Sequence, residues 1–369
     1  MTTRRWLGCL TVLLCLTAGC GPTDTVTIQG CGATLPSPLY ERWFLEFYLM
    51  HPNVRVNYQA VGSSAGVKQF EEGLVDLGAT DESLDKKKLE ALAKKRGSEV
   101  IQIPMTAGSI ALCHNIPDYP EKADFNLSRQ ALIDILLGDL VYWDDPRIQS
   151  ANSVKLPHLE IAFISRAEGS GTTFVFTNYL NAIAPIWRTD SKDPRWNDKG
   201  GPGKGKTIQW PKKLVDSRRL IGGKGNAGVA ALIQQTPGAL GYIETGYAEM
   251  TDMPIAALEN HEKKFVKPTA DYCKAALEKA KADPVAIALP AADPEGDKVY
   301  PIVTFTWIIV CRNYPDPQVT QRLKEVLGYC LESKEAKKGQ QLSEQLGYIP
   351  LPDAILEKAR AEVATLGTR

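Results

Sequence analysis

Three short segments rich in glycine and hydroxyl side chains carry the clearest chemistry in this sequence. They are residues 31–36, 62–66 and 169–173, and each joins a strand-like run to an amphipathic, helix-like run. At such a helix start, free N–H groups, the helix dipole and short hydroxyls bind anions, and glycine lets the backbone approach the ligand. One such turn is explained by helix capping alone. Three in one chain favour a shared oxyanion ligand.

Two charged residues lie beside these segments. Arg166 directly precedes the third segment, where its guanidinium can donate two parallel hydrogen bonds to an oxyanion. Asp81 follows Gly78-Ala79-Thr80 at a predicted strand end, the place where open α/β sheets bind ligands. Each residue also has a purely structural interpretation, since Arg166 can pair with Glu168 on the surface and Asp81 can cap a helix.

Three enzyme-like motifs give alternatives. Residues 62–66 fit the G-x-S-x-G nucleophile elbow, so a secreted serine hydrolase using Ser63 or Ser64 is one alternative function. A serine hydrolase needs a partner histidine. None of the three histidines that follow the motif stands in a sequence context typical of a catalytic histidine. Residues 200–207 fit a nucleotide-binding P-loop but precede Trp210-Pro211 instead of a helix. Residues 223–228 fit G-x-G-x-x-G without a hydrophobic strand before them, which indicates only a helix start.

The elements that must position these segments alternate along the chain. Residues 26–28, 54–58 and 75–78 read as strands, and residues 39–50 and 65–72 read as helices. This alternation predicts an α/β fold with a parallel sheet covered on both faces. The apolar runs 101–116 and 300–311 are long for strands of one small sheet. They therefore fit two crossings between lobes.

A second helix and strand series lies between these two apolar runs. Its members are residues 129–138, 160–165, 172–184, 227–235 and 240–243. Amphipathic helices are expected at 318–332 and 352–366, and the Pro- and Gly-rich residues 190–206 predict an exposed loop. The expected boundaries are a signal peptide at 1–19, a first lobe at 20–105 and 303–369, and a second lobe at 106–302.

The N-terminus has the layout of an export signal. Arg4 and Arg5 precede an apolar run at 6–16 and small residues before Cys20. The run is too short to span a bilayer. Cys20 would become the first mature residue and carry a lipid, which anchors a periplasmic or cell-surface protein to its membrane. Thr17 stands where an aliphatic residue is usual, so a freely secreted protein with an incidental cysteine is the alternative.

Composition excludes several classes of protein. The 369 residues include 43 Lys plus Arg and 43 Asp plus Glu, with 44% hydrophobic residues, which suits two soluble domains. Zero net charge argues against a nucleic-acid partner. Losing Arg4 and Arg5 with the signal peptide leaves a net charge of −2, so anion capture must depend on local dipoles and one arginine. Salt should then weaken binding only modestly.

The cysteines and histidines predict neither a metal site nor a cofactor. The five cysteines beyond Cys20 contain no C-x-x-C pair, and the four histidines are isolated from one another. Their odd number leaves at least one free thiol. Cys311 and Cys330 are close in sequence, and we expect them to form a disulfide.

Taken together, these segments resemble the phosphate-binding proteins of Pst-type phosphate ABC transporters. The resemblance rests on residues 31–40, 56–69, 76–81, 166–177 and 223–242, in family order, and covers nearly all of the mature chain. It implies a type II two-lobed periplasmic-binding-protein fold. Its cleft would close on inorganic phosphate as hydrogen phosphate, without covalent chemistry, and deliver it to a membrane permease and ATPase complex.

The resemblance also implies the ligand groups. Carried over position by position, they are Ala33, Thr34, Leu35, Ser63, Asp81, Arg166, Ser170, Gly171 and Thr172. Two positions depart from the family pattern. Leu35 replaces a usual Phe, which a backbone contact would tolerate. Glu168 replaces a shorter Asp, so the pairing that holds Arg166 can differ.

Asp81 gives the expected site its selectivity. Hydrogen phosphate carries a proton that a carboxylate accepts, whereas sulfate offers only acceptor oxygens. Asp81 therefore argues against the related ligands sulfate and molybdate. A phosphate sensor or adhesin on the same fold remains an alternative use of the site.

Overall fold

The computed structural model describes residues 25–197, 199–333 and 339–368. The expected signal peptide at 1–19 and the expected lipidation site Cys20 lie outside these residues. Among the helices of the described residues, none has the length and apolar character needed to cross a bilayer.

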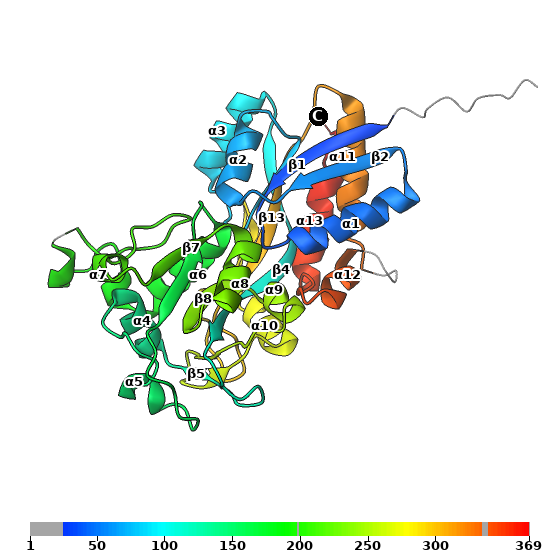
Figure 1. Ribbon diagram of the computed structural model, residues 1–369. Helices are drawn as coiled ribbons and strands as arrows, with labels where there is room; N and C mark the ends of the chain where they lie inside the picture. Colours follow the sequence, from blue (N-terminus) through cyan, green and yellow to red (C-terminus); the bar gives the residue numbers. More distant parts are fainter. Residues whose placement is uncertain (1–24, 198, 334–338, 369) are drawn as a thin grey trace, which may run out of the picture.

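One eight-stranded sheet runs through the whole molecule in the order β2-β1-β3-β13-β4-β8-β6-β7 (Figure 1). Its strands are β1 Val26–Gly32, β2 Val54–Gln59, β3 Leu77–Thr80, β4 Val100–Asn115, β6 Ala162–Arg166, β7 Leu220–Gly223, β8 Ala239–Glu244 and β13 Val303–Cys311. The strands β1, β2 and β3 are parallel at one end, and β6, β7 and β8 are parallel at the other. Each end is the sheet of one lobe, as predicted.

The long strand β4 connects the two lobes. Its first part pairs with β13, and its last part, from Ile110 to Asn115, pairs with β8. Every residue of β4 except the last is buried, which explains the unbroken apolar run in the sequence. The strand β13 lies beside the first part of β4 and brings the chain back to the first lobe. These are the two predicted crossing strands, while the residues at which each lobe begins and ends stay a prediction.

Helices cover both faces of the sheet, as the alternation predicts. The first lobe has α1 Ser37–Met50, α2 Ser63–Glu71 and α3 Lys86–Arg96, joined by the C-terminal helices α11 Pro317–Cys330, α12 Gly339–Gln345 and α13 Asp353–Ala364. The second lobe has α4 Arg129–Leu137, α5 Pro146–Gln149, α6 Gly171–Ile183, α7 Lys212–Asp216, α8 Gly225–Gln235, α9 Thr245–Met250 and α10 Ala270–Leu277. Short strands β5 Asn126–Leu127, β9 Ala257–Glu259, β10 Phe265–Val266, β11 Lys281–Asp283 and β12 Ile287–Leu289 form two small sheets.

The expected disulfide between Cys311 and Cys330 is wrong. Both thiols are free and buried, as are Cys31, Cys113 and Cys273. Cys311 belongs to the apolar cluster under α2 and α3, together with Phe70 and Leu92. Cys330, at the end of α11, belongs to the large cluster that contains α1 and α13. The two residues pack into separate clusters of the core, which closeness in sequence cannot show.

The loop at 190–206 is exposed, as predicted, and it is also anchored to the second lobe. Many of its side chains are exposed, and Pro194–Trp196 form a single 3₁₀ turn. However, Trp187 donates its indole N–H to Gly203 O at 2.8 Å, and Ser170 N donates to Lys206 O at 2.9 Å. The loop is therefore fixed against the start of α6.

Candidate oxyanion-binding site

Four helix N-termini meet where the two lobes face each other. The helices α1, α2, α6 and α8 each begin shortly after a strand of the central sheet, namely β1, β2, β6 and β7. Because the carboxyl ends of parallel strands lie along one edge of a sheet, their following turns gather there. The positive ends of four helix dipoles therefore point toward a common region.

The second and third glycine-rich turns touch across the lobes. Gly171 N donates to Ser63 Oγ at 3.2 Å, and Ser64 N donates to Gly169 O at 3.2 Å. A Cβ on Gly171 would lie 2.5 Å from Ser63 Oγ and 2.6 Å from Asp81 Oδ2. Glycine is therefore required here, because any side chain would push the two turns apart.

Several backbone donors of these turns remain available. In the described part of the chain, the N–H groups of Thr34, Leu35, Ser63 and Thr172 donate no hydrogen bond to another protein group. By contrast, Ala33 N donates to Ala79 O at 2.9 Å, and Ser170 N is bonded to Lys206. Ala33 and Ser170 thus fix the turns to the strand and the loop behind them, while the four available groups can donate to an anion.

Arg166 is the cation of the site. Its side chain is 1% exposed, and its Nε donates to Glu168 Oε1 at 2.9 Å while Nη1 donates to Thr172 Oγ1 at 3.2 Å. Glu168 Oε1 also accepts from Gly225 N at 3.1 Å. The longer Glu168 therefore still holds the guanidinium, and it connects the arginine to the start of α8. The pair is not the surface ion pair that the sequence left open.

Asp81 is a buried carboxylate between the two lobes. Its backbone N–H donates to Ser63 Oγ at 3.4 Å, and its carbonyl accepts from Thr304 Oγ1 at 3.3 Å. Burial raises the pKa of the Asp81 carboxyl to about 7, although nearby hydroxyls and cations oppose the shift. Asp81 caps no helix, because α3 is capped by Asp85, which accepts from Lys88 N at 2.7 Å.

Asn226, which sequence reasoning did not select, is central to the site. It is fully buried, and its Nδ2 donates to Thr34 Oγ1 at 3.0 Å and to Thr172 Oγ1 at 3.5 Å. Its Oδ1 accepts from Glu244 N at 3.1 Å. The signal was present in the G-x-G-x-x-G segment, which does begin a helix as predicted. The segment also follows a strand, β7, which the sequence hid because two of its four residues are glycines.

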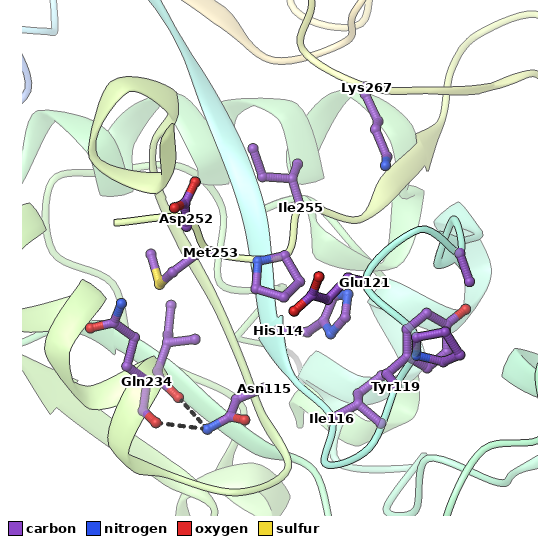
Figure 2. Close-up of a pocket in the computed structure, with 14 residues that line it drawn as sticks. His114, Asn115, Ile116, Tyr119, Glu121, Gln234, Asp252, Met253, Ile255 and Lys267 are labelled. Atoms are coloured by element: carbon purple, nitrogen blue, oxygen red, sulfur yellow. Dashed lines mark hydrogen bonds between the residues drawn. The ribbon is translucent and has the colours of Figure 1, made fainter. Parts of the chain in front are cut away.

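The histidines do not form a catalytic site with Ser63 or Ser64. His158 is bonded to Asp144 and His261 to Glu262, both on exposed surfaces. His114 lines a separate cavity of about 230 Å³ with Tyr119 and Lys267 (Figure 2). Within the residues that the structure describes, neither serine forms a hydrogen bond with a histidine. The nucleophile-elbow motif is thus a helix start whose serine faces the opposite lobe.

Known proteins are similar to this chain in sequence and in fold. The model of the PBP superfamily domain matches residues 20–334. The phosphate-binding protein PstS of Methanocaldococcus jannaschii is 36% identical over 353 residues, covering 90% of this chain and 84% of that protein. PstS of Pasteurella multocida is 31% identical over 345 residues, covering 93% and 91%.

A solved phosphate-binding protein from Stenotrophomonas maltophilia has the same fold, with a TM-score of 0.69 at 18% identity over 91% of this chain and 94% of that chain. The superfamily match, together with curated relatives above 30% identity over most of their length, establishes the family. The chain belongs to the PBP superfamily and, within it, to the PstS phosphate-binding proteins.

Proposed function

We propose that this protein binds inorganic phosphate outside the cytoplasm and delivers it to a membrane ABC transporter. One observation carries the proposal: between the two lobes, the buried carboxylate of Asp81 lies beside several N–H and O–H groups that can donate hydrogen bonds to an anion. The relatives above 30% identity are named phosphate-binding proteins, which supports the same ligand.

The donor set suits a compact, multiply charged oxyanion. Burying such an ion is costly unless protein groups replace its water. The proposed ligand groups come from all three turns and from the two charged residues beside them: Ala33, Thr34, Leu35, Ser63, Asp81, Arg166, Ser170, Gly171 and Thr172. The direct donors in this set are the available N–H groups of the turns, the hydroxyls and Arg166, which supplies the one full positive charge. The N–H groups of Ala33 and Ser170 are bonded within the protein, so we expect their backbones to shape the turns.

Asp81 sets the preference for phosphate over sulfate. An ionised Asp81 accepts the proton of hydrogen phosphate, whereas it faces only acceptor oxygens of sulfate. An unmatched buried polar contact costs about 1–3 kcal/mol, which is roughly 5- to 140-fold in affinity. The same repulsion disfavours molybdate.

The remaining parts of the proposal concern delivery. We expect the lobes, with boundaries at 105/106 and 302/303, to close on phosphate by hinge motion and to present it to a permease and ATPase complex. Lipidation of Cys20 would keep the protein at the membrane surface. Phosphate capture needs no cofactor and no covalent step, so we expect no enzymatic turnover.

Titration calorimetry of the mature protein with phosphate and with sulfate tests the function. Phosphate should bind with a defined stoichiometry and sulfate should bind far more weakly in the same buffer. A parallel assay with ester substrates should show no hydrolysis. Equal affinity for the two anions, or no phosphate binding, would refute the proposal, and ester turnover that depends on Ser63 or Ser64 would favour the hydrolase.

A further inference from the structure

Three buried polar atoms near Asp81 lack a hydrogen-bond partner among the described residues. They are Asp81 Oδ1, Thr306 Oγ1 and Tyr40 OH. Tyr40 and Thr306 are fully buried, and Asp81 is 2% exposed. Unpaired buried polar groups are rare because each loses its bonds to water without replacement. Three of them around one carboxylate call for a functional explanation.

The sheet places Thr306 directly beside Asp81. The strands β3 and β13 are antiparallel, and their pairing ends with Thr80 opposite Trp307. Asp81 and Thr306 are the next residues on the two strands, and the Thr306 hydroxyl acts on the Asp81 carboxyl. A break in the pairing of β13 with β4 also falls between Thr306 and Trp307. Such irregularities occur next to functional sites, where they redirect a side chain.

The Thr306 hydroxyl acts on both of its neighbours. It lowers the pKa of the Asp81 carboxyl and that of the Tyr40 phenol. For Tyr40 the effect of burial is larger, so the pKa of the phenol stays well above its usual value. Tyr40, on α1, is therefore a neutral phenol that can donate a hydrogen bond. A chain from Tyr40 OH to Thr306 Oγ1, and from the Thr306 hydroxyl to Asp81 Oδ1, would pair all three atoms.

We propose that Tyr40 and Thr306 are positioning residues that keep Asp81 ionised and oriented for the proton of bound phosphate. The inference rests on the proposed function. Asp81 Oδ2 lies on the side of Gly171 and the opposite lobe, so the Thr306 chain would hold the other oxygen, Oδ1. A protonated Asp81 would donate a hydrogen bond to sulfate and lose the repulsion that excludes it.

Other groups also act on the Asp81 carboxyl, and they set the background for any change in pH. Arg166, Lys206 and Ser63 lower the pKa of the Asp81 carboxyl and so favour the ionised carboxylate, whereas burial opposes it. The Asp81 charge in turn raises the pKa of its buried neighbours Glu244, Tyr58, Tyr247 and Tyr348. The hydroxyl of Thr306 is the largest influence that favours ionisation.

The test is calorimetry of phosphate and sulfate from about pH 5 to about pH 8.5 on the Thr306→Val variant, which keeps the shape of the side chain. Loss of a hydrogen bond to a charged group should raise the sulfate-to-phosphate affinity ratio about tenfold or more. The pH below which sulfate competes should also move upward. Tyr40→Phe should shift the affinity ratio and this pH in the same direction as Thr306→Val, but by less. Thr306→Ser, which keeps the hydroxyl, should restore both to the values of the unmodified protein.

Thr106→Val is the matched control. Thr106 lies opposite Thr306 on β4, is equally buried, and donates to Ile349 O at 3.1 Å, away from Asp81. If Thr306→Val has the selectivity and pH profile of this control, the inference is wrong. If Thr306→Val does not fold, unchanged selectivity in Tyr40→Phe overturns it instead. Failure of the unmodified protein to bind phosphate would refute the proposed function itself, a separate result.

Discussion

The side-chain amide of Asn226 donates a 3.0 Å hydrogen bond to the hydroxyl of Thr34, and this bond joins the two lobes. Thr34 lies in the turn between β1 and α1, and Asn226 lies in the first turn of α8. Tyr247, on α9, adds a second link by donating its hydroxyl to Thr34 O at 3.0 Å. These contacts hold the first glycine-rich turn against the second lobe, so any opening of the lobes at this turn must break them.

Replacing Asn226 with Ala should weaken phosphate binding about tenfold or more. The change removes the bonds to Thr34 and Thr172 and leaves Glu244 N without its acceptor in a buried place. Calorimetry with phosphate measures the loss, and Asn181→Ala on the outer part of α6 is the control. Equal affinities for the two variants would show that Asn226 has no part in closure.

The ion pair between Lys206 Nζ and Glu82 Oε2, 2.9 Å apart, should slow ligand release. It connects the loop at 190–206 with the segment after β3, and both side chains are mostly buried. Because partly exposed pairs contribute up to about 1 kcal/mol, Glu82→Ala should speed phosphate dissociation about two- to fivefold. Stopped-flow exchange of radiolabelled phosphate gives the rate. Glu72→Ala breaks an exposed pair with Lys68 inside the first lobe and should leave the rate unchanged.

Asp81→Asn should admit sulfate. The amide has nearly the same shape as the carboxylate, and its N–H donors remove the repulsion of sulfate oxygens. We expect sulfate affinity to rise about tenfold or more relative to phosphate, measured by competition calorimetry. Asp85→Asn, at the exposed cap of α3, is the control. Unchanged discrimination in Asp81→Asn would remove the carboxylate from the mechanism.

Local sequence signals predicted the three turns and most of the sheet. Strand-like runs followed by glycine and hydroxyl residues identify helix starts without any knowledge of tertiary structure. Residues 26–28, 54–58 and 240–243 all lie in strands of the structure. The strand expected at 75–78 begins two residues later, at Leu77, and includes Ala79 and Thr80. Shifts of one or two residues are normal because the ends of elements carry the weakest signals.

Partners that are distant along the chain could not be predicted. Asn226 and Thr34 are 192 residues apart, and only the fold brings them into contact. The same holds for Tyr40, Thr306 and Asp81, which come from three elements of the first lobe. Closeness in sequence was also misleading, since it favoured a disulfide between two cysteines in separate core clusters. The order of the family motifs, rather than the residue patterns alone, indicated that these distant segments belong to one site.

The five described cysteines should all be unreactive in the native protein. Each is buried and free, and burial raises the pKa of the Cys31 thiol to about 11 and that of Cys273 to about 12. A thiol reagent should modify none of them under native conditions and all of them in denaturant without reductant. A lower count in denaturant would indicate a disulfide that this fold does not contain. Cys311→Ser and Cys330→Ser should each lower the denatured count by one.

The ligand-free protein should lose stability as the pH rises from about 4 to about 8. Burial raises the pKa of Asp81 to about 7 and that of Glu244 to about 8, above the value near 4 of an unfolded carboxyl. Between these values the folded state binds more protons than the unfolded state, so a higher pH favours unfolding. Asp81→Asn removes one buried charge and should raise Tm at about pH 8 by roughly a few degrees, with little effect near pH 4. Thermal unfolding in phosphate-free buffer measures this, with the exposed Asp118→Asn as the control. An equal gain in Tm at both pH values would mean that the pKa of Asp81 is the same in the folded and the unfolded protein, and the prediction would then be wrong.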